Sequence, residues 1–151
     1  MNQGLLTGGK TAAMQQLLDA LKNQKTVTLY DLPESQAAYI AALVTNITGK
    51  RVLLVLPNDL AAGKAADDAQ QLLGGQAACF PGGEIELGHG TSSHEGDWRR
   101  LETLQRVVNG DIRLLCASMD ALMLRMASPD MFKASILRLA PGDRFGPDKL
   151  I

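Results

Sequence analysis

Apolar residues along the chain fall into short continuous runs and into longer stretches with helical spacing. The two clearest runs, residues 51–56 (RVLLVL) and 112–117 (IRLLCA), are apolar without alternation. Strands of a parallel sheet have this pattern because helices cover both of their faces. Two shorter runs, residues 26–29 and 76–80, also predict strands, and Pro81 ends the second of them.

Between these runs, apolar residues recur three to four positions apart, which is the spacing of an amphipathic helix. This spacing predicts helices over residues 10–23, 36–46, 58–73 and 95–109. Ser35 can cap the second helix. That helix also carries alanines that permit a neighbouring helix to pack closely, namely Ala37, Ala38, Ala41 and Ala42. Ser118 can cap a further short helix, which Pro129 closes.

The alternation of strands and helices predicts an α/β fold, with a mainly parallel sheet and helices on both faces. The order of the elements is P-loop-NTPase-like. We assign residues 1–134 to this domain. Residues 135–151 are interpreted as the truncated start of a second domain, because a strand at 135–139 and the first turn of a helix from Pro147 stop without a cap.

Composition narrows the class of protein. Hydrophobic residues make up 46% of the chain but aromatic residues only 4%, so aliphatic side chains must fill the core. The formal net charge of −1 argues against a dedicated nucleic-acid module, which normally carries a strong positive excess. The two cysteines have no metal-type spacing and fit a reducing, cytoplasmic environment. No apolar run is long enough to span a membrane.

Residues 4–11 (GLLTGGKT) match the Walker A pattern of phosphate-binding loops, with Gly4, Gly9, Lys10 and Thr11 at its defining positions. In such a loop, backbone N–H groups cradle the phosphates, the lysine reaches the terminal phosphates and the hydroxyl holds magnesium. The geometry requires a buried strand immediately before the loop. Only three residues precede this match, which favours a lead-in to the first helix. A small P-loop enzyme remains the alternative, with Asp31, Asp59 or Asp120 supporting the metal.

The strand–loop–helix unit where a phosphate loop would belong is residues 26–46. Its loop consists of Asp31, Leu32, Pro33, Glu34 and Ser35. It has no glycine and no lysine, its proline lacks a donor N–H, and its two acids would repel an anion. The loop therefore indicates a degenerate nucleotide site, with no cofactor and no catalytic residue.

A cluster of polar residues precedes the helix at 95–109, and it could suggest a metal site. It comprises His89 and His94 with Glu84, Glu86 and Glu95, in a spacing that fits no standard zinc motif. We interpret them as polar loop residues and predict no metal.

Both cysteines are interpreted as structural. Cys116 lies within an apolar run and is expected to be a buried core thiol. Cys79 borders a turn and is expected to be partly exposed, without a histidine at a catalytic spacing.

Arg99 and Arg100 are the candidate residues for contact with a nucleic acid or a partner. Adjacent helical positions differ by about 100°, so the two side chains cannot share one face. The favoured interpretation places both on the helix surface, beside acids such as Asp97 and Glu102. Trp98 belongs to the apolar stripe of the helix and is expected to anchor it in the core.

Five segments in order resemble a known family. Residues 51–58 (RVLLVLPN) look like the second strand–helix unit of UvrB-type domains. Residues 80–85 (FPGGEI) resemble the segment that follows it in bacterial transcription-repair coupling factors. Residues 99–104 (RRLETL), 118–123 (SMDALM) and 137–143 (LRLAPGD) are similar to later segments of the same family, the last opening its second domain. The resemblance covers about residues 25 to 151.

The resemblance implies a function in DNA repair. The first segment of a coupling factor is a UvrB-like, helicase-like fold that has lost its ATP site, and the degenerate loop at 31–35 agrees with that. The intact protein displaces stalled RNA polymerase by ATP-driven translocation on DNA and recruits UvrA. UvrA contact belongs mainly to the second domain, so the chain is expected to be a non-catalytic scaffold module with weak or no DNA binding of its own.

Overall fold

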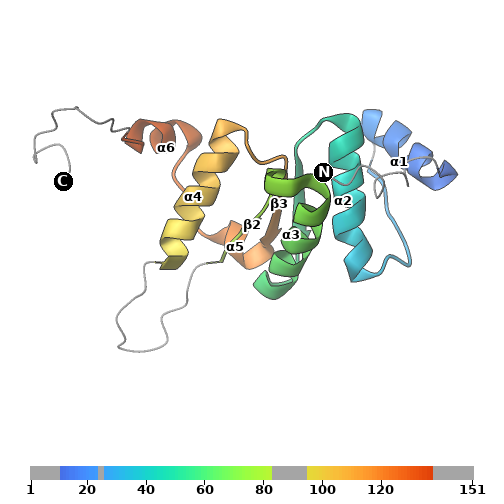
Figure 1. Cartoon of the computed structure of the whole chain (residues 1–151), viewed down its shortest axis with the longest axis horizontal. Helices are drawn as coiled ribbons and strands as arrows, with labels where there is room; N and C mark the ends of the chain where they lie inside the picture. Colours follow the sequence, from blue (N-terminus) through green and yellow to red (C-terminus); the bar gives the residue numbers. More distant parts are fainter. Residues whose placement is uncertain (1–10, 24–25, 83–94, 138–151) are drawn as a thin grey trace, which may run out of the picture.

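The computed structural model describes residues 11–23, 26–82 and 95–137, which form helices around a small parallel sheet (Figure 1). The first two helices precede all of the strands: α1 spans Ala12–Lys22 and α2 spans Glu34–Thr48. Strand β1 (Val52–Leu56) leads into α3 (Asp59–Leu73). A short 3-10 turn, η2 (Gly74–Gln76), then connects α3 to β2 (Ala77–Phe80).

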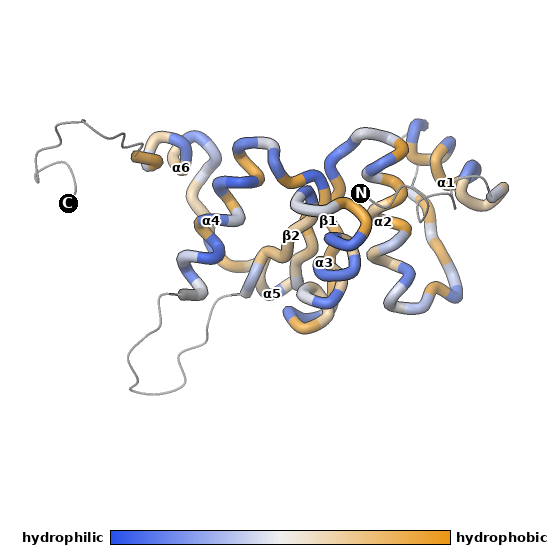
Figure 2. Tube along the Cα trace, in the orientation of Figure 1, coloured by the Kyte–Doolittle hydropathy of each residue, from blue (hydrophilic) through white to orange (hydrophobic). Residues whose placement is uncertain are grey.

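The second half of the chain repeats the alternation. Helix α4 covers Glu95–Asn109 and strand β3 covers Leu114–Ser118. Two short helices follow, α5 (Met119–Met123) and α6 (Pro129–Ser135). Figure 2 shows hydrophilic and hydrophobic segments alternating along the helices, as expected for amphipathic helices packed on one side.

Local signals set most of these boundaries. The side chains of Asn58 and Ser118 accept hydrogen bonds from the backbone N–H groups of Ala61 and Ala121, which caps α3 and α5. Gly49 ends α2 in the left-handed conformation with φ 71°, which glycine adopts without steric cost. The helices predicted near 10–23, 58–73 and 95–109 are confirmed within two residues at each end.

The sheet contains three parallel strands in the order β1–β3–β2. Leu53 of β1 and Ala78 of β2 both lie opposite Leu115 of the central strand. Because successive residues of a strand point to opposite faces, this register assigns every strand residue to one of two faces. The predicted parallel α/β fold is therefore confirmed, in the form of a small sheet.

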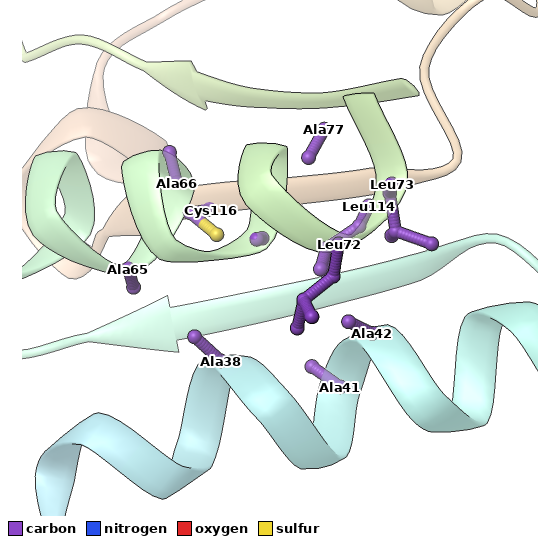
Figure 3. Packing of buried hydrophobic residues seen from close by; sticks show 11 residues of the cluster. Ala38, Ala41, Ala42, Ala65, Ala66, Leu72, Leu73, Ala77, Leu114 and Cys116 are labelled. Atoms are coloured by element: carbon purple, nitrogen blue, oxygen red, sulfur yellow. The ribbon is translucent and has the colours of Figure 1, made fainter. Parts of the chain in front are cut away.

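Helices α2 and α3 cover the face that carries Leu114 and Cys116. Alanines of both helices meet over these two residues, joined by Leu72, Leu73 and Ala77 (Figure 3). The alanines are Ala38, Ala41 and Ala42 of α2 and Ala65, Ala66 and Ala69 of α3. The close packing predicted from the alanines of the second helix is confirmed.

Helices α4 and α5 cover part of the opposite face. Phe80 and Ala117 are buried there with Ala121 of α5, and Leu104 of α4 packs against them. The covering stops short of β1, where Leu53 is 52% exposed and Val55 is 43% exposed. Helices therefore lie on both faces, but half of the second face is open.

Helix α1 forms an outer layer. Its buried residues Met14, Leu17 and Leu18 pack against Leu43 of α2, and α2 lies between α1 and the sheet (Figure 1). None of the helices in the described parts of the chain is both long and apolar enough to cross a membrane.

Two predictions about the segment before and at the start of α2 are wrong. Residues 26–30 form neither a strand nor a helix, and Tyr30 is 83% exposed. The preference of Val27 and Leu29 for strands depends on which residues pack on them, and none of the strands in the described residues pairs with this segment. Helix α2 begins at Glu34, and the residue at its cap position is Pro33, two residues before the predicted cap Ser35.

The predictions for the C-terminal part are also partly wrong. Pro129 begins α6 instead of closing the preceding helix, because proline is well suited to the first helical turn. Ser135 is the last residue of this helix and not the start of a strand. The remainder of the predicted strand from residue 138, and the predicted helix start at Pro147, lie outside the described residues.

Candidate functional site at the carboxyl edge of the sheet

Ligands of open parallel α/β sheets bind outside the carboxyl ends of the strands, so this edge is the first place to search for a site. Three segments meet there. Asp59 begins the helix after β1, Ser118 ends β3, and Pro81 and Gly82 follow β2. The three strands are parallel, which brings their following segments to the same edge.

A serine and an aspartate from two of these segments contact each other directly. The Ser118 hydroxyl donates to a carboxylate oxygen of Asp59 and accepts the N–H of Ala121 at 3.0 Å. Ser118 is fully buried, whereas Asp59 is exposed. Gly82 lies so close that a Cβ atom there would clash with the Asp59 carboxylate. The polar groups at this edge are therefore engaged with each other.

Arg100 of α4 closes the same edge from the other side of the sheet. Its side chain is buried, with 8% exposed, and its guanidinium lies 4.3 Å from the centre of the Phe80 ring. The guanidinium donates to the carbonyl oxygen of Pro81, and its contacts with the carbonyl oxygen of Ala121 are 3.4 and 3.5 Å long. Arg100 thus links α4 to the segments that follow β2 and β3.

The charge of Arg100 is balanced by its surroundings. Burial lowers the pKa of the guanidinium, while the nearby carboxylates of Asp97 and Asp59 act in the opposite direction. A guanidinium is effectively always protonated in proteins, so Arg100 places a buried positive charge here. Its backbone acceptors and the face of Phe80 compensate for the water that it loses.

The surface interpretation of the arginine pair is therefore right for Arg99, which is exposed, and wrong for Arg100. The expectation that the two side chains lie on different faces is confirmed. Trp98 is 69% exposed, so its predicted place in the core is also wrong. Helix α4 turns Arg100 and Thr103 inward, with Leu104 beside them, and this rotation carries Trp98 to the outside.

The two cysteines are neighbours across β2 and β3, where Cys79 is opposite Cys116. Cys116 is fully buried and Cys79 is partly exposed, as predicted. Burial raises the pKa of the Cys79 thiol, and the charges of Asp59 and Asp67 raise it further. Burial, followed by the neighbouring Cys79, raises the pKa of Cys116 to about 12. Raised pKa values make both thiols weak nucleophiles.

We therefore expect Cys116 to resist alkylation by iodoacetamide near pH ~8, where a pKa of about 12 leaves only about one thiol in 10⁴ ionised. The rate should rise at least about 100-fold when urea unfolds the chain. Mass spectrometry of the labelled peptides measures each cysteine separately. Equal folded and unfolded rates at Cys116 would contradict its burial.

The raised pKa also has a consequence for stability. An unfolded cysteine has a pKa of about 8.5, so the folded state holds the Cys116 proton more tightly. This contribution to stability is complete below about pH 8.5 and is lost as the pH rises towards about 12.

Of the first candidate phosphate loop, the structure describes only the last residue. Gly4, Gly9 and Lys10 lie outside the described residues. The hydroxyl of Thr11 caps α1 by accepting the N–H of Met14 at 3.4 Å. The helix that would follow a phosphate loop packs on the sheet, whereas α1 packs on α2. Helix α1 is thus not placed on the sheet as the helix after a working Walker loop would be.

The loop at residues 31–35 leads into α2 without a side-chain cap. Asp31 adopts φ 54°, a left-handed conformation that aspartate tolerates better than most residues. Leu32 is half-buried, and Pro33 and Ser35 are exposed. Pro33 contributes no N–H group to the first turn, which removes one of the donors that a phosphate would need.

Most of the residues considered as metal ligands lie outside the described part of the chain. His89, His94, Glu84 and Glu86 lie outside the described residues, and so does the side chain of Glu95. Within residues 11–23, 26–82 and 95–137, no group of three or more potential metal ligands lies together.

Comparisons with known proteins identify no relative of the chain. No family model, no curated protein and no solved structure matches the chain. The resemblance to coupling factors thus rests on the sequence motifs alone.

Proposed function

We propose that the chain is a non-catalytic scaffold module whose α/β frame does not bind nucleotide. The observation that carries the proposal is the occupation of the carboxyl edge by the chain's own side chains. Ser118 bonds Asp59 there, and Arg100 bonds the backbone of Pro81 and Ala121. A phosphate would have to displace these contacts to reach the ends of the strands.

The loop before α2 supports the same conclusion. A phosphate-binding loop presents successive backbone N–H groups on a flexible glycine-rich turn. The loop at 31–35 contains no glycine. It carries the acidic side chain of Asp31, and a proline occupies the cap position of α2. We interpret this as the degenerate nucleotide site of a P-loop-NTPase-like and helicase-like, UvrB-type domain.

The sequence motifs supply the biological context of the proposal. They resemble those of transcription-repair coupling factors, which couple stalled RNA polymerase to nucleotide excision repair. In that context the module supports an intact protein that translocates on DNA, contacts the polymerase and recruits UvrA. The alternative of a small P-loop enzyme using Gly4, Gly9, Lys10 and Thr11 is disfavoured by the capping role of Thr11.

We expect no heat of binding when magnesium-ATP is titrated into the chain by calorimetry, up to millimolar nucleotide. The reason is that the loop at 31–35 follows no strand and carries Pro33, and that α1, the helix after the Walker match, packs on α2 instead of the sheet. The Lys10→Ala variant serves as the control and should behave like the parent chain. Micromolar affinity that Lys10→Ala abolishes would overturn the proposal and establish the Walker match as a real site.

We also expect the chain not to retain UvrA in a pull-down, whereas a longer chain that includes a complete second domain should. The family's recruiting surface belongs mainly to that second domain, of which residues 135–151 would provide only the beginning. Retention of UvrA by residues 1–134 alone would contradict this expectation and place the recruiting surface on the α/β domain. Residues 84–95 would then be the first segment to mutate.

A further inference from the structure

The open half of the second sheet face forms an apolar groove beside α4. Leu53 and Val55 of β1 are 52% and 43% exposed there. The groove has a volume of about 220 Å³ next to Leu53, and Val107, Ile112 and Leu115 form its other apolar walls. The exposed strand residues and the groove therefore form one continuous apolar surface, from β1 to the C-terminal half of α4.

The shape of this surface fits a helix. Parallel sheets are normally covered by helices on both faces. Helix α4 packs on β2, and with α5 it covers the half of this face formed by β2 and β3. A second helix would lie about 8 to 10 Å from the axis of α4. That position is directly above Leu53 and Val55, where β1 is uncovered.

An arginine gives the surface a positive end. Arg51 precedes β1 and Arg113 precedes β3, so both lie at the amino end of the strands, and both line the groove. The guanidinium of Arg113 donates at 2.8 Å to the carbonyl oxygen of Thr45 in α2, the helix that covers the other face, so Arg51 is the arginine left to provide a charge at the groove. Within the described residues neither arginine is within ion-pair distance of a carboxylate. The positive end is therefore not neutralised by described acids.

We propose that this surface binds an amphipathic helix of a partner protein, with its apolar stripe over Leu53 and Val55 and acidic residues in its last turn at Arg51. The negative end of the helix dipole and the acidic side chains would both meet Arg51 there. The apolar stripe would cover the strand residues that α4 leaves open. The inference does not depend on the proposed function, because it uses only the open face and its charge.

The test uses the full chain and a displayed library of 18-residue peptides. Leucines are fixed at positions i, i+4, i+7 and i+11, and the other positions are randomised. We expect selection to enrich glutamate and aspartate in the last turn. The strongest peptide is then synthesised, and its affinity for the chain is measured by fluorescence anisotropy.

Four variants locate the binding. The double variant Leu53→Gln/Val55→Thr and the single variant Arg51→Glu should each weaken binding at least about tenfold, the effect of removing an important interface contact. Arg51→Glu should also favour a peptide whose acids are replaced by lysine. The matched controls Leu60→Gln and Arg125→Glu alter exposed residues elsewhere and should change affinity less than about twofold. Circular dichroism checks that each variant is folded.

Three outcomes would overturn the proposal. The first is the absence of enriched helical peptides, or peptides that are insensitive to the Leu53 and Val55 changes. The second is a dimer in sedimentation equilibrium that the same changes abolish, because the occupant would then be a second copy of the chain. The third is displacement of the selected peptide by a synthetic peptide of residues 138–151, because the chain would then cover its own surface.

Discussion

Replacing Arg100 by alanine should lower the free energy of unfolding by about 2 to 4 kcal/mol, an unusually large effect for an arginine on a helix. The guanidinium is buried and is bonded to the carbonyl oxygens of Pro81 and Ala121. Each buried acceptor left without a partner costs about 1 to 3 kcal/mol. The stem and the plane of the guanidinium also pack on Phe80, and this contact is lost with the side chain.

The neighbouring Arg99 offers a matched control, since it lies in the same helix and is exposed. Arg99→Ala should change stability by less than about 0.5 kcal/mol. Urea denaturation of both variants measures the difference. Arg100→Lys should recover only part of the loss, because an ammonium cannot reproduce the planar fork that reaches two carbonyls and stacks on a ring. Equal effects of the two alanine substitutions would contradict the buried role of Arg100.

The strands and most helix ends were predictable because their signals are local. Residues 51–56 and 112–117 are apolar without alternation, and both contain strands of the parallel sheet. Asn58 and Ser118 cap helices because their short polar side chains reach the backbone N–H group three residues ahead. Such features depend on a few neighbouring residues and need no knowledge of the tertiary structure.

The errors arose where packing at a distance overrides local preference. In α4, the apolar side chain of Trp98 is outside and the charged side chain of Arg100 is inside. Hydropathy alone predicts the reverse. The partners that permit Arg100 to be buried lie 19 and 21 positions away, at Pro81 and Ala121. Residues 26–29 likewise have the composition of a strand, but none of the three described strands pairs with them.

The pairing of Ser118 with Asp59 was missed although its elements were recognised. The two residues are 59 positions apart, and each was noticed for another reason, Ser118 as a helix cap and Asp59 as an acid after a strand. Parallel strands send their following residues to the same edge. Applied to the two clearest strands, this rule would have brought Asp59 and Ser118 together. The groove beside α4 was not predictable in this way, because it depends on where α4 lies across the sheet.

Replacing Ala42 by leucine should destabilise the chain by about 3 kcal/mol, because the added carbon atoms have no space between α2 and α3. Ala42 is fully buried and faces the alanines of α3, and Leu72 points towards it (Figure 3). Leucine is nearly as good a helix former as alanine, so helix propensity does not explain a loss of this size.

Ala13→Leu, an identical change at an exposed position of α1, should be nearly neutral in thermal denaturation. The double variant Ala42→Leu/Leu72→Ala restores the volume and should be more stable than the sum of its single changes predicts. Strict additivity, or a neutral Ala42→Leu variant, would show that α2 and α3 are not packed alanine against alanine.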